Sequence, residues 1–511
     1  MVRFASHTRL PSELLDEQAR IEAYARDFGL DFFPLFFEVL SFDQMNEVAS
    51  YGGFPSRYPH WRFGMEYERL AKSHEYGLSK IYEMVINNNP SVAYLLEGNS
   101  LIEQKLVMAH VYAHVDFFKN NYVFNSTNQG VDPRTGGPIR KWIDTFANHG
   151  AIIRRWVDRV GVEEVERFID VCLGLDNLID PTRQENASTN KSAGWSDTDE
   201  LAPEVPLLRV DREYMTDYIN PREFVDSQRE RLEIEQTKDK VFPSEPAHDV
   251  LAFLVEHAPL ERWERDVLQI VRREACYFAP QGQTKIMNEG WATYWHSKII
   301  TEKAAHAGEI IDYADRCASV LAVQPGQLNP YKLGVELFRH IEDRWNKGRF
   351  GTEWDNCDDM ETRRAFDRRV NLGREKLFEV RAFYNDVTFI DEFLTPDFVA
   401  HNKMYAFGYS ARNSRWEIES RVFDEVKEKL LLALTNGGHP RIYIADANGS
   451  NRGELVLSHV YSGIDLRIDY AESVLAGLAS IWKRPVELHT IIEGKESALR
   501  YDGAEHSQRS L

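Results

Sequence analysis

Apolar residues recur at helical spacing along most of the chain, and this pattern predicts a mainly helical protein. The repeat is found in residues 13–29, 65–86, 100–119, 140–159, 221–239, 247–278, 284–306, 329–347 and 413–435. Side chains spaced in this way share one face of an α-helix, so each segment can bury an apolar stripe against its neighbours. We therefore expect a large helical body over residues 1–436, in which the polar segment 181–203 forms a mobile loop.

The pattern changes after Asn436, where short alternating segments replace the helical repeat. Residues 441–445, 454–461 and 486–492 are predicted strands, and residues 469–483 are a predicted helix. The sequence thus predicts a small α+β module over residues 437–511.

Composition and charge narrow the classes of function. The chain has 511 residues, 43% of them hydrophobic, and a formal net charge of −20. Such a charge disfavours nucleic acid and anionic membranes as partners, because both attract basic surfaces. The sequence has no apolar export signal or membrane-spanning run, and its cysteines form no CxxC motif. We expect a cytoplasmic protein with reduced thiols and no integral membrane segment.

A candidate metal site stands out from this background. His110 and His114 are four positions apart on a predicted helix, which begins with a capping box formed by Ser100 and Glu103. Glu289 lies in a second predicted helix and can supply a carboxylate. Two imidazoles and one carboxylate form the ligand set of many catalytic zinc sites. The alternative interpretation is a pair of hydrogen-bonded core histidines.

The segment Asn288–Ala292 resembles the third-ligand segment of the gluzincin metallopeptidases. In those enzymes a glutamate follows the first histidine and acts as general base, whereas here that position is Val111. The resemblance therefore implies gluzincin-like metal-site helices without the usual base. His296, two helical turns after Glu289, is our candidate catalytic residue. Asp116 lies about 200° around the helix from His114 and should be solvated or ion-paired elsewhere.

Other polar residues leave alternatives open. Glu245, His248 and Glu274 keep a two-metal, ferritin-like arrangement possible, although no Glu-x-x-His spacing is repeated. The aromatic segment Tyr51–Gly64 is either a wall for a ligand or a loop packed across helix ends.

Several segments together carry a family resemblance. They are Asp31–Leu40, Gly64–Leu70, Val85–Pro90, His110–Asn120, Gln283–Ala292 and Asn329–Gly334. This set resembles the SpoVR family (stage V sporulation protein R), and the length and C-terminal module are most similar to its Gram-negative branch. In spore formers the resemblance implies a role in spore cortex formation. Elsewhere it implies a role in stress and stationary phase, beside a PrkA-type serine protein kinase and a von Willebrand-type domain protein.

Two hypotheses of different classes follow. In the first, the chain is a metal-dependent hydrolase of an amide or peptide-like bond, such as one in a cell-wall precursor, with a divalent ion, zinc by preference, held by His110, His114 and Glu289. In the second, it is a non-catalytic regulatory or scaffold protein that works with the kinase and the von Willebrand-type protein. Val111 would then mark a lost active site.

Overall fold

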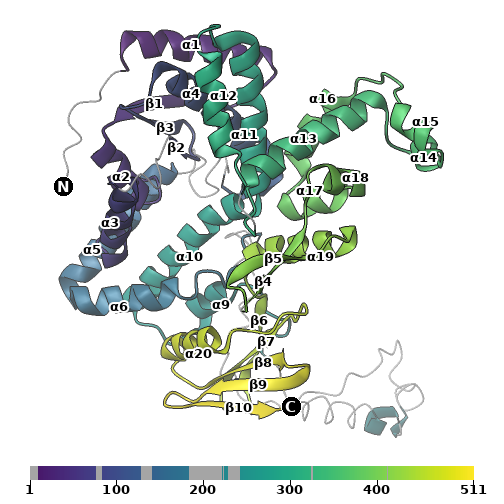
Figure 1. Ribbon diagram of the computed structural model, residues 1–511. Helices are drawn as coiled ribbons and strands as arrows, with labels where there is room; N and C mark the ends of the chain where they lie inside the picture. The colour runs from purple at the N-terminus through teal and green to yellow at the C-terminus, as the bar shows by residue number, and fades with distance from the viewer. Residues whose placement is uncertain are drawn as a thin grey trace, which may run out of the picture. The chain divides into compact units, whose positions relative to one another are not determined.

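The computed structural model describes residues 10–75, 83–127, 141–182, 221–227 except 223, 242–323, 326–410 and 412–511. These residues are mainly helical, as the periodicity predicted (Figure 1). The chain divides into two compact units. Unit 1 joins Met1–Asp170 to Ile270–His439, and unit 2 joins Val171–Gln269 to Pro440–Leu511. The predicted domain boundary after residue 436 lies close to Pro440, although unit 2 also takes in a segment assigned above to the helical body.

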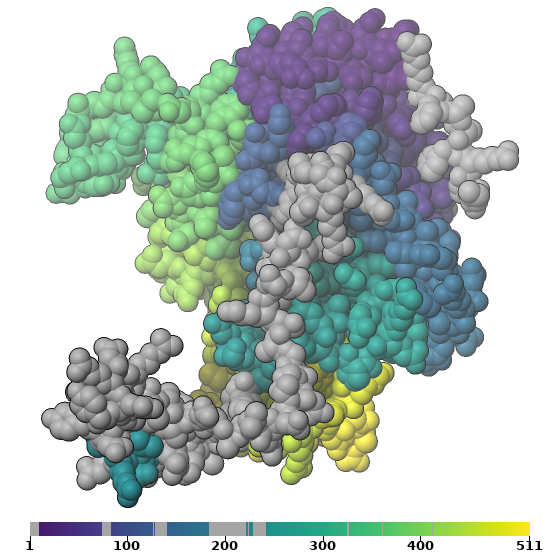
Figure 2. Space-filling view, turned by 180° about the vertical axis from the view of Figure 1, so that it is seen from behind, coloured from purple at the N-terminus to yellow at the C-terminus, as the bar shows by residue number. Residues whose placement is uncertain are grey.

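Unit 1 is built mainly from helices. They are α1 (Ser12–Asp27), α2 (Phe42–Ser50), α3 (Trp61–Glu75), α4 (Leu101–Asn120), η1 (Tyr122–Ser126), α5 (Trp142–Val160), α11 (Lys285–Ile299), η4 (Ile300–Ala304), α12 (Ile310–Val320), α13 (Pro330–Lys347), α14 (Thr352–Asp355), α15 (Met360–Ala365), α16 (Gly373–Phe383), α17 (Asp386–Phe393), α18 (Pro396–His401), α19 (Phe423–Leu434) and η5 (Thr435–Gly438). Helices α6 (Val162–Leu173) and α10 (Arg262–Gln283) each include residues of both units. Helices α14 and α15 stand away from the rest of unit 1 (Figures 1 and 2).

A small sheet in unit 1 was not predicted. Strand β1 (Leu35–Leu40) pairs in parallel with β3 (Ser91–Leu96), and β2 (Glu83–Ile86) pairs with β3 in antiparallel orientation. The predicted helix 65–86 is therefore wrong at its end, because residues 83–86 are strand; residues 76–82 lie outside the described part of the chain. Pairing with β3 overrides the local helical pattern. As a result Glu83 stands at the start of a strand, opposite Leu95.

Helix α11 packs against both α4 and α13, and these contacts form the centre of unit 1. The predicted capping box is confirmed at the start of α4, where Ser100 and Glu103 bond reciprocally. Helices α11 and α13 approach most closely at Gly290 and Gly334. A β-carbon added to Gly290 would lie 2.5 Å from the Cα of Gly334, so the crossing has no room for a side chain there.

A buried carboxylate ties α4 to its neighbours. Asp116 accepts hydrogen bonds from Trp291 Nε1 (2.9 Å), Arg381 Nη1 (2.6 Å) and the backbone N–H of Asp31 (2.7 Å). It is fully buried, so of the two expected environments the ion-paired one is confirmed. Because Trp291 lies on α11, the bond fixes α4 and α11 to each other two residues beyond His114.

A second, two-stranded sheet in unit 1 joins β4 (Ala406–Ser410) to β5 (Arg415–Ser420). The predicted helix 413–435 is thus wrong over β5 and correct over α19. Trp416 and Ile418 on β5 do have spacing compatible with a strand, but the long apolar run that follows them favoured a helix.

Unit 2 contains α9 (Val250–His257) and a sheet of five strands in the order β10-β9-β8-β7-β6. Their bounds are β6 (Ile442–Gly449), β7 (Glu454–His459), β8 (Val486–Ile492), β9 (Lys495–Tyr501) and β10 (His506–Ser510). Strands β7 and β8 are parallel and are connected through α20 (Ile468–Trp482), which packs on β8 and β9. The predicted C-terminal α+β module is confirmed, and β9 and β10 were not predicted.

The expected loop 181–203 lies almost wholly outside the described residues, as does most of the predicted helix 221–239. Among the described helices, each is too short or too polar to span a lipid bilayer.

Candidate metal centre

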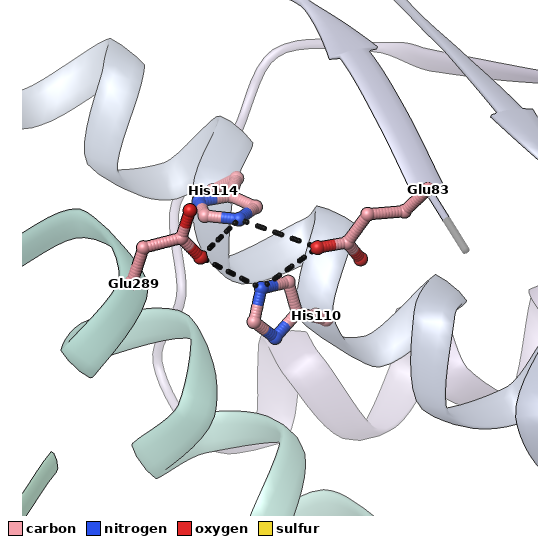
Figure 3. A group of neighbouring side chains, drawn as sticks. All are labelled: Glu83, His110, His114 and Glu289. Carbon is pink, nitrogen blue, oxygen red and sulfur yellow. Dashed lines mark ion pairs between the residues drawn. The ribbon is translucent and has the colours of Figure 1, made fainter. Parts of the chain in front are cut away.

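Four side chains from three elements of unit 1 meet at one point (Figure 3). Helix α4 supplies His110 and His114, α11 supplies Glu289, and β2 supplies Glu83. Each offers one ligand atom, and these atoms all lie within 4.8 Å of one another. The structure therefore brings together the three predicted ligands and adds a carboxylate that the sequence analysis did not identify.

The distances between these atoms fit a tetrahedral site. Both carboxylates lie near His110 Nε2, at 3.1 Å for Glu83 Oε1 and 3.4 Å for Glu289 Oε2. The corresponding distances from His114 Nε2 are 3.9 Å and 3.5 Å. Ligand atoms about 2.1 Å from a tetrahedral zinc ion are about 3.4 Å from each other. The four distances between a histidine nitrogen and a carboxylate oxygen, 3.1 to 3.9 Å, thus bracket the tetrahedral value.

Two of these atoms are buried and have partners only within the cluster. His110 Nε2 and Glu289 Oε2 lie 3.4 Å apart as an ion pair, and neither makes a hydrogen bond outside the cluster. His110 and Glu289 are only 3% and 6% exposed. The donor set, its spacing and these two atoms fit a divalent metal ion.

The atoms that face away from the cluster do have partners. His114 Nδ1 is 2.8 Å from Asn288 Oδ1, and Lys285 Nζ is 2.5 Å from Glu289 Oε1. The first bond places the proton of His114 on Nδ1 and leaves Nε2 free to act as a ligand. The second leaves Oε2 of Glu289 facing the centre. Asn288 and Lys285, both on α11, thus orient one candidate ligand from each helix.

The electrostatics of the cluster are strongly coupled. Burial alone would lower the pKa of His110, but the carboxylates of Glu83 and Glu289 raise it to about 9. Burial and the neighbouring His110 lower the pKa of His114. Burial would raise the pKa of Glu289, but His110, His114 and Lys285 hold it well below its usual range. A proton on His110 thus balances the carboxylates, and a cation at the centre would replace that proton.

His296, the predicted catalytic residue, lies beside the cluster but does not contribute a ligand atom to it. Its ring centroid is 5.2 Å from that of His110, and its Nδ1 is 3.3 Å from the hydroxyl of Tyr313. Burial holds the pKa of His296 well below its usual value, so the ring is neutral at pH 7. Its catalytic role remains a prediction.

The other candidate ligands do not join this group. Glu274 forms a buried ion pair with Arg57 and lies 3.0 Å from Nδ1 of His149. Glu245 and His248 belong to unit 2. Within the described part of the chain, the potential metal ligands gather in the one cluster around His110.

The aromatic segment 51–64 packs into unit 1. Phe54 stacks on Phe146 with a centroid distance of 3.7 Å, and Tyr58 and Phe63 are buried. Trp61 is half exposed and starts α3. Tyr51, Trp61 and Phe63 also line a cavity of about 810 Å³, so the segment has one packed part and one part that borders a cavity, and both interpretations stay open.

The sequence reasoning missed Glu83 because residues 65–86 were assigned to one helix. The signal available was the short apolar run Met84–Ile86, which is bounded by Glu83 and by Asn87. A charged residue at the start of a four-residue strand carries little information on its own.

Comparisons with known proteins cover nearly the whole chain. The SpoVR like protein family matches residues 9–439, and the SpoVR-like C-terminal domain matches residues 440–493. The chain is 32% identical over 443 residues to the uncharacterized protein YcgB of Escherichia coli (strain K12), with 80% of this chain and 77% of YcgB covered. No solved structure matched the chain. The chain belongs to the SpoVR family, as its motifs predicted.

Proposed function

We propose that this protein is a metal-dependent hydrolase of an amide or peptide-like bond, with His110, His114 and Glu289 as ligands of a divalent ion, zinc by preference. The observation that supports it is the cluster itself, in which one ligand atom each from His110, His114, Glu289 and Glu83 lies within 4.8 Å of the others. The resemblance to a family with a role in spore cortex formation suggests a cell-wall precursor as substrate.

The residues around the centre have distinct roles in this proposal. A bound divalent ion supplies Lewis acidity, which polarises a carbonyl and makes a nearby water more acidic. Asn288 holds the tautomer of His114, and Lys285 holds Oε1 of Glu289. Neutral His296 takes the proton of the attacking water and returns it to the departing amine nitrogen as the C–N bond breaks.

The proposal predicts narrow rather than general hydrolysis. Val111 is fully buried and has no proton acceptor, so the position that carries the base in gluzincins is inert here. A general base typically contributes about 10²–10⁴-fold to the rate. Unfolded proteins and unblocked peptides should therefore be cleaved poorly in the presence of zinc. Robust proteolysis that a chelator abolishes would contradict this account of Val111.

Elemental analysis of the untagged protein tests the metal directly. We expect one equivalent of a divalent ion in the wild type and its loss in His110→Ala and Glu289→Ala. Glu274→Ala, which removes an equally buried glutamate outside the cluster, is the matched control for metal content. If the wild type contains no stoichiometric metal and takes none up, the proposed function is wrong.

Val111, which stands where gluzincins have their catalytic base, supports a second candidate function. In it, the protein is a regulatory or scaffold protein that works with a PrkA-type kinase and a von Willebrand-type domain protein. Affinity purification from starved cells distinguishes the two. The scaffold function predicts a stable complex that persists in His110→Ala. The hydrolase function predicts that His110→Ala abolishes the cellular function of the protein, and it requires no stable complex with these partners.

A further inference from the structure

We infer that Glu83 closes the metal centre in the resting protein as a fourth protein ligand, and that β2 must move away from α4 before substrate can enter. This inference rests on the proposed metal centre and adds the regulation of its access. Glu83 lies outside the gluzincin-like segments. Because it is on β2, displacement of this strand would leave His110, His114 and Glu289 in place.

The first support is that the two carboxylates are equivalent in position. Glu83 lies 3.1 and 3.9 Å from the two Nε2 atoms, and Glu289 lies 3.4 and 3.5 Å from them. They approach the histidine pair from opposite sides (Figure 3). A group that only accepted a proton from an attacking water would lie outside this shell, because the water would separate it from the ligand atoms. Glu83 instead occupies the fourth vertex.

The second support is that the two carboxylates differ in how firmly they are held. Glu289 is in the middle of α11, next to the close contact of Gly290 with Gly334, and Lys285 fixes its other oxygen. Glu83 is the first residue of a four-residue strand, and its side chain is 22% exposed against 7% for Glu289. Among the described residues its ion pairs are with His110 and His114 alone. Glu83 is thus the ligand that can leave.

The consequence concerns coordination. Zinc sites with four protein ligands are closed, whereas catalytic sites keep one position for water or substrate. With Glu83 bound, the centre has no free position. When β2 withdraws, the position opens, while His110, His114 and Glu289 keep the ion. Access would then be controlled by β2, an edge strand whose four residues pair with β3 in the described sheet.

Azide binding to the Co²⁺-loaded, untagged full-length protein tests this inference without a known substrate. Azide is a small anion that occupies a free position, and Co²⁺ reports it through its visible spectrum. We expect one equivalent of Co²⁺ in the wild type and a spectrum that azide does not change. In Glu83→Ala we expect retained Co²⁺, an affinity lowered by about tenfold or more, and a spectrum that azide shifts.

Two further variants complete the experiment. Glu38→Ala removes a carboxylate from β1 of the same sheet and should behave like the wild type. Glu83→Gln, with far-UV circular dichroism, covers the case in which Glu83→Ala does not fold. A wild-type spectrum that azide shifts as strongly as that of the Glu83 variants overturns the inference but leaves the metal centre intact. A wild type that binds no Co²⁺ overturns the metal centre itself.

Discussion

Asn288 links the two helices that carry the candidate ligands, through a single side-chain contact. Its Oδ1 lies 2.8 Å from Nδ1 of His114, in a buried environment. The imidazole cannot rotate or change tautomer without breaking this bond. The residue just before Glu289 therefore determines which nitrogen of a histidine on another helix faces the centre.

The contact makes a prediction about metal affinity. Asn288→Leu should lower the affinity for Zn²⁺ by about 10–100-fold, because His114 loses the acceptor that holds its tautomer. Asn288→Asp keeps an acceptor at the same position and should stay within a few-fold of the wild type. Competition with a chromophoric chelator measures both constants. Equal losses in the two variants would show that Asn288 acts through packing instead.

Val111 provides a second prediction at this scale. The side chain is fully buried within the apolar core of unit 1. Val111→Glu would therefore bury a carboxylate, and we expect it to lower the free energy of unfolding by about 3–5 kcal/mol. Val111→Ala, which only removes methyl groups, should cost less. Urea unfolding measures the free energy of unfolding of both variants. If Val111→Glu were as stable as the wild type, its carboxylate would have to reach the histidines.

At the scale of elements, the glycine pair controls how closely α11 and α13 pack. Gly290 follows Glu289 directly, and Gly334 lies one turn after Tyr331, whose hydroxyl contacts Glu289. Both belong to segments that carried the family resemblance. The close crossing brings Tyr331 to the ligand on α11, so the glycines serve the centre through the backbone.

Gly290→Ala should therefore be destabilising. The new β-carbon would overlap the backbone of α13, and we expect a loss of about 3 kcal/mol in the free energy of unfolding. Gly64→Ala is the matched control, because Gly64 is also helical and has open space around it. It should stabilise by up to about 1 kcal/mol through helix propensity. Similar effects of the two substitutions in thermal unfolding would rule out the steric explanation.

The sequence predicted elements well where local periodicity and tertiary packing agree. Helix α4 has both a capping box and a continuous apolar face, and its bounds differ from the prediction by one residue at each end. Strand β2 has four residues and gains its identity from pairing with β3, which local pattern cannot reveal. Strands β9 and β10 are rich in polar residues and were missed for the same reason. Three of the four clustered side chains lay on helices and were named as candidates from the sequence; Glu83 lay on β2 and was not.

At the scale of the whole molecule, His340 is a largely buried histidine whose lowered pKa links protonation to stability. Burial, followed by the charge of Arg344, lowers the pKa of His340 to about 4. Its Nε2 lies 3.2 Å from the hydroxyl of Thr395. In the unfolded chain a histidine titrates near 6.5. The unfolded state therefore binds the proton first as the pH falls.

This difference predicts acid sensitivity. The neutral His340 ring makes its full contribution to the free energy of unfolding above pH 6.5. That contribution is lost as the pH falls from about 6.5 to about 4. Because the ring is partly solvated, we expect a loss on the order of 1 kcal/mol. His340→Gln should reduce the slope of unfolding free energy against pH in this interval. Chemical unfolding at a series of pH values measures the two slopes, and parallel curves would contradict the assignment.

The distance along the chain between the clustered side chains has a consequence for biosynthesis. His114 and its partner Asn288 are 174 residues apart in sequence, and Glu83 lies still further from Glu289. A ribosome that has released the segment up to α4 has made both histidines but no carboxylate from α11. At that stage the nascent chain has His110, His114 and Glu83 but not Glu289, so the four-residue centre is complete only after α11 has emerged and docked. The complete centre would thus form late in translation, when most of unit 1 has been made.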